Sequence, residues 1–205
     1  MTAPPATGPA RTAMHLVDAL AVVRAKRGPR DVVVTTMAPA RDWMAMAAGE
    51  LEPLDLVLVP SAMGQATSMG LGLALAQPAR RVIVCNGDGS MLMNLGSLVS
   101  IVAAAPPNLV VLVFDNGVYE VTGAQITPGS VAGVDYVAVA RACGFKSVYR
   151  FSDPTAWNAS ADEVLGAVGP TFALLDIAPT PGVPGPRSPG PAAERSRRFI
   201  EALRV

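Results

Sequence analysis

The chain has 205 residues, a length that suits one domain, and its 16 basic and 16 acidic residues give a formal net charge of zero. Apolar residues make up 51% and charged residues only 16%, which excludes a disordered chain and allows a large core. The lack of a basic excess argues against a nucleic-acid-binding protein. A chain this apolar either enters a membrane or buries surface against another chain.

Two long uncharged stretches, residues 56–79 and 89–114, are the candidates for a membrane segment. Glycine, proline and asparagine interrupt both, so neither offers the roughly 20 continuous apolar residues of a spanning helix. No secretory signal is visible, and Cys85 and Cys143 fit neither a disulfide framework nor a metal spacing. We therefore expect a cytoplasmic protein with two reduced thiols and no membrane contact.

After a flexible N-terminal tail over residues 1–11, helices and strands are predicted to alternate along the chain. In chain order the predicted elements are helix 12–27, strand 31–36, helix 41–49, strand 54–59, helix 64–76, strand 81–86, helix 91–105, strand 109–114, helix 135–143, strand 145–151, helix 161–168 and strand 171–177. Strands without polar alternation are buried on both faces, and alternation with helices implies right-handed crossovers. We expect a three-layer α/β/α domain over residues 12–178, with a mostly parallel sheet of about six strands.

Residues 179–191 differ from the rest in carrying six prolines spaced largely by glycines. Such a composition cannot form a core, so the segment is predicted to be an extended arm. A C-terminal helix is predicted over residues 192–203 within the final segment 192–205. Its basic residues Arg195, Arg197 and Arg198 are interpreted as a solvated helix face.

The most informative stretch is the predicted strand 81–86 with the residues that follow it, Gly87-Asp88-Gly89-Ser90. Ligands of open α/β sheets lie beyond the carboxyl ends of strands, and the two glycines let the backbone approach a ligand closely. The N–H groups that begin the next helix suit a phosphate. Because an aspartate would repel phosphate, the motif predicts a divalent cation between them, such as Mg²⁺.

A second polar turn follows the next predicted strand, where Asp115-Asn116-Gly117 comes directly after residues 109–114. Neighbouring parallel strands lie about 5 Å apart, so the two strand ends are expected side by side. Asn116 offers a side-chain oxygen, and the turn after it offers a backbone carbonyl. Either turn alone is common, but together they predict a Mg²⁺–phosphate site.

This pair of turns resembles the diphosphate motif of the thiamine-diphosphate (ThDP)-dependent 2-oxo acid decarboxylase family. The family's common form ends in two asparagines, and here Asp115 stands at the first of them. The resemblance covers roughly residues 12–190 and implies the ThDP-binding fold of the family's pyrophosphate-binding domain. It also implies that Mg²⁺ is held by Asp88, Asn116 and the main-chain carbonyl of Val118.

A second resemblance lies upstream, where Pro60-Ser61-Ala62-Met63-Gly64, followed by Gly70-Leu71-Gly72, is similar to the segment under the thiazolium ring. The resemblance makes Met63 the wedge that bends the cofactor, with the backbone around Ser61 accepting from its 4′-amino group. Tyr119 faces the thiazolium side in this reading, and a packing role for it stays open. The implied cofactor-binding residues are Thr36, Ser61, Ala62, Met63, Gly64, Gly87, Asp88, Gly89, Ser90, Asn116, Val118 and Tyr119, and the implied catalytic residues are Met63 and Tyr119.

Further matches, at residues 91–98, 116–119 and 122–125, are most similar to the β subunit of two-subunit sulfopyruvate decarboxylases and to phosphonopyruvate decarboxylases. The implied reaction is the non-oxidative decarboxylation of a small 2-oxo acid. The family's site also needs a glutamate that hydrogen-bonds N1′ of the cofactor, and this chain offers no good candidate. The resemblance therefore implies a hetero-oligomer, α2β2 or larger, in which a separate pyrimidine-binding subunit supplies that glutamate.

Three further polar residues are given structural interpretations. Glu120, which follows the metal motif, is interpreted as a carboxylate at the surface or behind the metal ligands. Arg41 suits an anionic substrate group, but a surface ion pair is the preferred interpretation. His15, the single histidine, is placed on the N-terminal helix away from the strand ends.

Alternative functions share parts of this pattern. An acetolactate-synthase-like ThDP carboligase stays open, because the fate of the decarboxylated substrate is decided by the pocket, partly on the partner. A 2-oxo acid:ferredoxin oxidoreductase subunit would usually carry more cysteines for iron–sulfur clusters. A non-catalytic ThDP-binding regulatory module would need neither the wedge Met63 nor the metal ligands. The motifs leave the particular 2-oxo acid and the partner undetermined.

Overall fold

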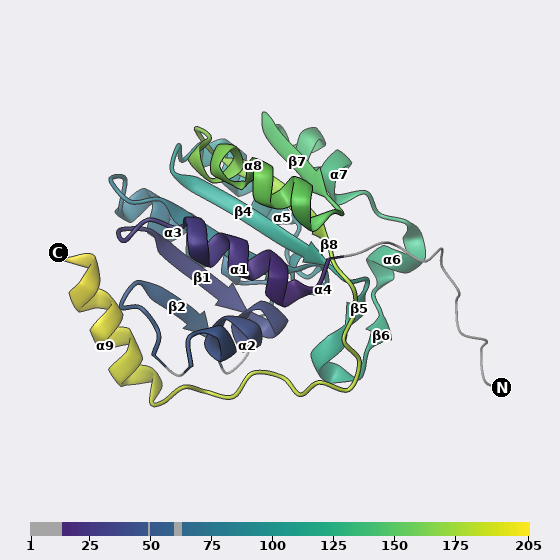
Figure 1. Ribbon diagram of the computed structural model, residues 1–205. Coiled ribbons are helices and arrows are strands. Elements are labelled where there is room, and N and C mark those ends of the chain that lie inside the picture. The colour runs from purple at the N-terminus through teal and green to yellow at the C-terminus, as the bar shows by residue number, and fades with distance from the viewer. Residues whose placement is uncertain (1–13, 49, 60–62) are drawn as a thin grey trace.

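The computed structural model describes residues 14–48, 50–59 and 63–205 of the chain. Six parallel strands form one sheet in the order β2-β1-β3-β4-β8-β7 (Figure 1). These strands are β1 (Val32–Thr36), β2 (Asp55–Leu58), β3 (Val82–Gly87), β4 (Leu109–Asp115), β7 (Ser147–Phe151) and β8 (Thr171–Asp176). The predicted parallel sheet of about six strands is confirmed.

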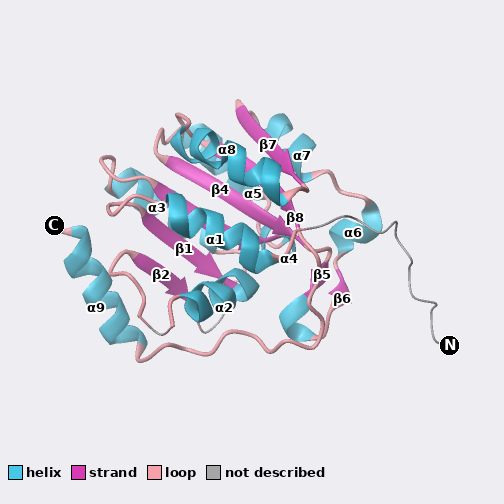
Figure 2. Ribbon diagram, in the orientation of Figure 1, coloured by secondary structure: helices cyan, strands magenta, loops and turns pink. Residues whose placement is uncertain are grey.

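Helices cover both faces of the sheet (Figure 2). One core lies under α1 (Leu16–Lys26), α2 (Met37–Met46) and α8 (Pro154–Gly166), and the other lies under α3 (Ala66–Ala76), α5 (Gly96–Ala104) and α7 (Tyr136–Cys143). Along β3, Ile83 and Cys85 belong to the first core, while Val82 and Val84 belong to the second. Successive side chains of a strand point to opposite faces of the sheet. Because helices cover both faces, side chains on both sides of each strand are buried, and the strands are therefore apolar without interruption. The three-layer architecture is therefore confirmed.

The predicted helix over residues 91–105 is wrong as a single element. The chain instead forms α4 (Asp88–Leu92) and, after a break at residues 93–95, α5. In the break, the Asn94 side-chain amide donates to the Gly64 carbonyl (2.9 Å), and the Asn94 carbonyl accepts from the Ser97 hydroxyl (2.7 Å). The apolar pattern over residues 91–105 gave no sign of this break, which is stabilised by the bond to the Gly64 carbonyl, distant in the sequence. Other helix ends differ too: α1 begins at Leu16, α2 at Met37 and α8 at Pro154.

Several short elements between β4 and α7 were not predicted. They are β5 (Val118–Tyr119), the 3-10 helix η1 (Glu120–Thr122), β6 (Gln125–Ile126) and α6 (Pro128–Ala132). The two strands pair antiparallel as a small hairpin outside the main sheet. Each element is too short to show a hydrophobic period. Their importance is positional, because the hairpin follows directly from the carboxyl end of β4.

Residues 179–191 contain no helix or strand and run from the end of β8 to α9 (Ala192–Leu203) beside β2 (Figure 1). The solvated interpretation is wrong for Arg195, whose guanidinium donates to the carbonyls of Val57 (2.8 Å) and Val59 (2.5 Å). These carbonyls lie on the outer edge of the sheet, so α9 covers an edge that would otherwise expose backbone acceptors. Arg197 and Arg198 are exposed, as expected.

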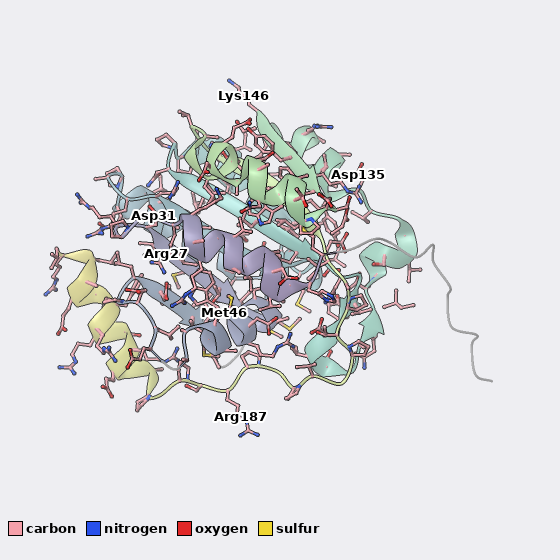
Figure 3. The ribbon with its side chains drawn as sticks, viewed as in Figure 1. Arg27, Asp31, Met46, Asp135, Lys146 and Arg187 are labelled. Atoms are coloured by element: carbon pink, nitrogen blue, oxygen red, sulfur yellow. The ribbon has the colours of Figure 1, made fainter. Side chains whose placement is uncertain are left out.

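The amino end of the sheet carries paired charges. Arg27 forms an ion pair with Asp55, and Asp31 forms one with Arg81, with Arg27 and Asp31 visible near the start of β1 in Figure 3. Lys146, by contrast, points away from the body of the domain (Figure 3). Across the described ranges, no helix combines the length and apolarity needed to cross a bilayer.

Candidate cofactor site

The ends of β3 and β4 lie side by side, as the sequence predicts. The two strands pair in parallel register, with Gly87 opposite Phe114. The turn after β4 therefore meets the start of α4, and the Asn116 main-chain N–H donates to the Asp88 carboxylate. Two motifs that are far apart in the sequence thus form one polar cluster at the carboxyl edge.

Asp88 is the electrostatic centre of this cluster. Its side chain is buried, with 2% of the residue exposed, and Asp115 beside it is 8% exposed. Burial, and secondly the charge of Asp115, raise the pKa of Asp88 to about 7, although N–H donors and the Thr127 hydroxyl (3.4 Å) oppose the shift. Two buried carboxylates this close gather negative charge that a divalent cation would neutralise. The donor set therefore fits Mg²⁺.

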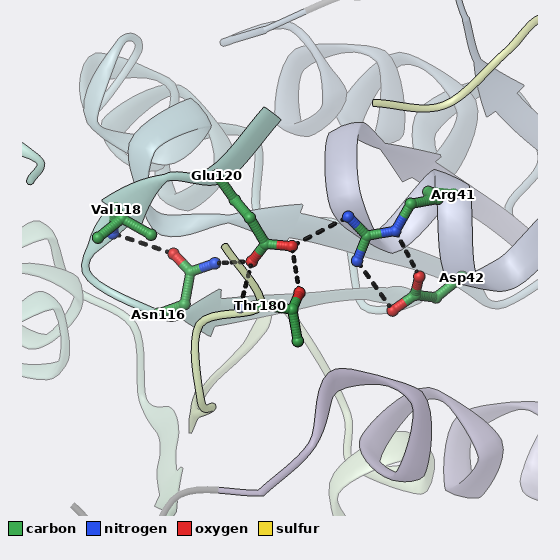
Figure 4. Close-up of polar contacts among 6 residues, drawn as sticks. All are labelled: Arg41, Asp42, Asn116, Val118, Glu120 and Thr180. Atoms are coloured by element: carbon green, nitrogen blue, oxygen red, sulfur yellow. Dashed lines mark hydrogen bonds and ion pairs between the residues drawn. The ribbon is translucent and has the colours of Figure 1, made fainter. Parts of the chain in front are cut away.

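Asn116 is held from both sides of its amide group. Its Nδ2 donates to Glu120 Oε2 (2.6 Å), and its Oδ1 accepts from the Val118 main-chain N–H (3.0 Å) (Figure 4). Val118, two residues after Asn116, is the first residue of β5, so its carbonyl lies next to the turn that carries Asn116. The three predicted metal ligands thus come from α4, the turn after β4 and the short hairpin.

Glu120 is a buried residue, which contradicts a position at the surface. Besides Asn116, its carboxylate accepts from Arg41 Nη1 (2.9 Å) and from the Thr180 hydroxyl (2.5 Å) (Figure 4). Arg41 also pairs with Asp42 (2.7 Å), and its side chain is 14% exposed. The interpretation of Arg41 as a surface ion pair is therefore wrong in its location, since the guanidinium is largely buried between two carboxylates.

A pocket opens beside this cluster, with a volume of about 40 Å³. Eight of the predicted site residues line it: Met63, Gly87, Asp88, Gly89, Ser90, Asn116, Val118 and Tyr119. We call this hollow the strand-end pocket. Residues that were not predicted complete its wall, among them Leu16, Val121 and Ile177.

The other predicted site residues are placed differently. Thr36 and Gly64 do not line the strand-end pocket. The Thr36 hydroxyl is buried and has no hydrogen-bond partner in the described part of the chain, while Gly64 donates its main-chain N–H to Ser90 Oγ (2.9 Å). Ser61 and Ala62 lie outside the described residues.

The structure shows a packing role for Tyr119. A Cβ atom added at Gly89 would come within 2.5 Å of the Tyr119 ring. The ring therefore lies against the backbone of the Gly-Asp-Gly turn, and only glycine leaves room for it at this position. Tyr119 also lines the strand-end pocket, so packing and ligand contact are compatible.

Sequence reasoning missed or misplaced three other residues. Thr127 donates to Asp88 and caps α6 before a proline at the first helical position, a cap signal that could have located it. The Asn86 side chain, at the end of β3, is buried without a hydrogen-bond partner among the described residues. His15 was placed away from the strand ends, but its neighbour Met14 pairs with Ile177, the residue directly after β8. In parallel α/β domains a helix begins where a strand ends, which explains that error.

Comparisons with known proteins point to one family. The model of the thiamine pyrophosphate enzymes' C-terminal TPP binding domain matches residues 40–177. Phosphonopyruvate decarboxylase of Streptomyces viridochromogenes is 44% identical over 142 residues, covering 68% of this chain and 35% of its own length. The β subunit of sulfopyruvate decarboxylase from Methanothermobacter thermautotrophicus is 46% identical over 117 residues, covering 57% of this chain and 59% of its own. The chain thus spans less than two thirds of either relative.

A solved structure shares the fold at low sequence identity. The ThDP-dependent 4-hydroxybenzoylformate decarboxylase of Rhodococcus jostii superimposes with a TM-score of 0.66 at 18% identity. The match covers 88% of this chain and 36% of that one. The resemblance predicted from the two polar turns therefore agrees with the matched family and with the matched fold.

Proposed function

Because the chain belongs to the family of thiamine pyrophosphate enzymes, through their C-terminal TPP binding domain, we propose that it is one subunit of a heteromeric 2-oxo acid decarboxylase. The proposed reaction removes CO₂ without oxidation from a small 2-oxo acid of the sulfopyruvate or phosphonopyruvate type. The names of the two relatives support the reaction, and the word "subunit" in one of them supports a partner chain. The free thiols of both cysteines favour the cytoplasm.

The observation that carries the proposal is the buried acidic pair at the ends of β3 and β4. Asp88 and Asn116 would hold Mg²⁺ through their side chains, and Val118 would do so through its carbonyl. The raised pKa of Asp88, caused by burial and then by Asp115, reflects charge that the chain alone leaves poorly compensated. A divalent cation held by these residues would supply that compensation.

Around the metal, this chain would orient the cofactor and exclude water. When bound, ThDP would supply a carbon nucleophile and an electron sink for the bonding pair that is left behind when CO₂ departs. Met63 would wedge against the cofactor, and Tyr119, Val121 and Ile177 offer an apolar wall beside it. The orphaned hydroxyl of Thr36, at the end of β1, is a candidate donor to the diphosphate.

Among the described residues that line the strand-end pocket, no acid is left free to activate the cofactor. Within the described residues, the carboxylates that line the strand-end pocket are Asp88 and Glu120. Asp88 is assigned to the metal, and Glu120 is occupied by Asn116, Arg41 and Thr180. We therefore place the activating glutamate on a separate pyrimidine-binding subunit.

The described lining of the same pocket offers no cation to recognise an anionic substrate. None of the described residues that line it is basic, and the nearby Arg41 is held by two carboxylates. A sulfonate or phosphonate is best bound by arginine or lysine. We infer that the partner supplies these cations, and with them the choice of substrate.

Two further observations support a partner that closes the site. The pocket volume of about 40 Å³ is far below the roughly 300–1,000 Å³ of complete small-molecule sites. The layer of α3, α4 and α5 also exposes large apolar side chains, namely Met69, Leu75, Met93 and Val99. Where exposed apolar side chains adjoin one another, they mark an interaction surface. A hetero-oligomer of the α2β2 type or larger would cover them.

Reconstitution tests the proposal. The complex is isolated from the native host through a tag on this chain, loaded with ThDP and Mg²⁺, and assayed with sulfopyruvate, phosphonopyruvate and pyruvate. We expect CO₂ and the matching aldehyde from the complex and no turnover from the isolated chain. Ligated products in place of aldehydes would indicate a carboligase, and tight ThDP binding without turnover on any acid would indicate a regulatory module.

A further inference from the structure

Glu120 connects the predicted metal ligand Asn116 to two distant parts of the fold. Its Oε2 accepts from Asn116 Nδ2 (2.6 Å), and its Oε1 accepts from Arg41 on α2 (2.9 Å) and from Thr180 at the start of the arm (2.5 Å). Figure 4 shows the carboxylate between these three groups. We propose that Glu120 is a positioning residue that fixes which end of the Asn116 amide faces the metal. This inference rests on the Mg²⁺ site of the proposed function.

The surroundings of Asn116 permit one orientation of its amide. The carboxylate of Glu120, beside the Arg41 guanidinium, acts as an acceptor and must face the Nδ2 end. The Val118 main-chain N–H can only donate, and it faces the Oδ1 end (3.0 Å). Both neighbours therefore select the same orientation independently.

Orientation matters because only one end of an amide can bind a metal. Mg²⁺ takes oxygen ligands, so a reversed Asn116 would present an NH₂ group to the cation. Oδ1 keeps a second lone pair after accepting from Val118, and this pair is available for coordination. With Glu120 in place, the oxygen is oriented before the metal arrives.

The remaining bonds of Glu120 explain why its carboxylate is held in place. Arg41 provides a buried counter-charge, and Thr180 donates through both its hydroxyl and its main-chain N–H (3.4 Å to Oε2). Removing one partner of a buried charge pair leaves the other uncompensated. Because Thr180 is the second residue of the Pro/Gly-rich segment, Glu120 connects that arm to the turn that carries the metal ligand.

The test uses Glu120→Gln, which keeps the size of the side chain but can donate as well as accept. The probe is Mn²⁺, which shares the oxygen-ligand preference of Mg²⁺, added with ThDP to the complex isolated through this chain. Free Mn²⁺ is followed by electron paramagnetic resonance, so the readout does not depend on turnover. We expect a 10–100-fold loss of Mn²⁺ affinity, as for other residues that orient metal ligands, with kcat largely recovered at saturating metal.

Thr180→Val is the matched control, since it removes a bond to the same carboxylate and leaves the Asn116 contact intact. Its Mn²⁺ affinity is expected to stay within about threefold of the unmodified complex, because the donor–acceptor pairing at Asn116 persists. Unfolding curves of both variants verify that each is folded.

A donor–acceptor exchange separates orientation from general packing. Asn116→Asp alone sets two carboxylates against each other, whereas Asn116→Asp combined with Glu120→Gln restores one donor facing one acceptor. We expect the double variant to bind Mn²⁺ at least tenfold more tightly than Asn116→Asp. An unchanged affinity in Glu120→Gln, or the lack of rescue in the double variant, overturns the positioning role. Absence of Mn²⁺ binding by the unmodified complex overturns the proposed metal site itself.

Discussion

Replacing Asp88 with asparagine is expected to stabilise the isolated chain at alkaline pH while removing its metal site. Asp88 is buried beside Asp115, and burial followed by that neighbouring charge raises its pKa from 3.8 to about 7. An acid with a raised folded-state pKa contributes stability below its unfolded pKa, and this contribution is lost as the pH rises toward the folded value. The unmodified chain should therefore lose stability between about pH 4 and pH 7 through this group.

The size of the effect follows from the shift of about 3 pH units. At roughly 1.4 kcal/mol per unit, the raised pKa of Asp88 costs the folded chain, relative to the unfolded chain, about 2 kcal/mol at pH 5 and about 4 kcal/mol at pH 8. Asparagine has nearly the same shape and carries no charge, so Asp88→Asn avoids this cost. Its advantage in free energy of unfolding should grow by about 2 kcal/mol between the two pH values.

Urea unfolding of the metal-free chain, with and without the substitution, measures this difference at each pH. Asp162→Asn is a suitable control, because Asp162 forms an exposed ion pair with Lys26 and should change stability by under about 0.5 kcal/mol at either pH. If the stability advantage of Asp88→Asn stays constant with pH, or if the variant becomes less stable than the unmodified chain as the pH rises, the inference that Asp88 carries an uncompensated charge is refuted.

The raised pKa of Asp88 also leads to a prediction about the pH dependence of metal binding. Protons compete with Mg²⁺ for Asp88, so metal affinity in the presence of ThDP should fall about tenfold per pH unit below pH 7. Isothermal titration of the complex with Mg²⁺ at pH 6, 7 and 8 measures the slope. A flat profile across this range would show that the Asp88 carboxylate does not take up the competing proton.

The remaining predictions concern glycines. Gly70→Ala brings a Cβ within 2.2 Å of the buried, stiff Val84 and should destabilise the chain by about 1–3 kcal/mol, whereas Gly72→Ala, on the same helix with no atom within 4 Å, should stabilise it by up to about 1 kcal/mol. Thermal unfolding of both variants tests this, and equal effects would contradict the packing of α3 on β3. Gly89→Ala should displace the Tyr119 ring, costing about 1–3 kcal/mol and altering the near-ultraviolet circular dichroism, and an unchanged spectrum would show that the ring is not confined there.

Much of the architecture could be predicted because it depends on local pattern. Strands such as β3 and β4 are buried on both faces, and continuous apolar runs bounded by turn residues record that burial directly. The two polar turns could be placed together because parallel strands end at one edge of the sheet. The helix predicted over residues 192–203, directly after the proline-rich segment, likewise matches α9 (Ala192–Leu203).

Elements whose boundaries depend on distant partners could not be predicted. The break between α4 and α5 is stabilised by a bond from Asn94 to Gly64, thirty positions away. From the sequence alone, Arg195 is interpreted as a solvent-facing arginine, and only the packing of α9 beside β2 reveals its bond to the Val57 carbonyl. In each case, the partner that decides the conformation lies outside any local window.

The sequence by itself determined the layered α/β fold, the juxtaposition of Asp88 with Asn116 and the resemblance to ThDP enzymes, because periodicity and strand-end motifs encode these features locally. Only the tertiary structure decided that Glu120 is buried and bonded to Arg41, 79 positions before it, and to Thr180, 60 positions after it. Burial of a single polar residue depends on which segments pack over it. No spacing within the chain records that outcome, since α2 and the arm reach Glu120 only after the sheet has brought their ends together.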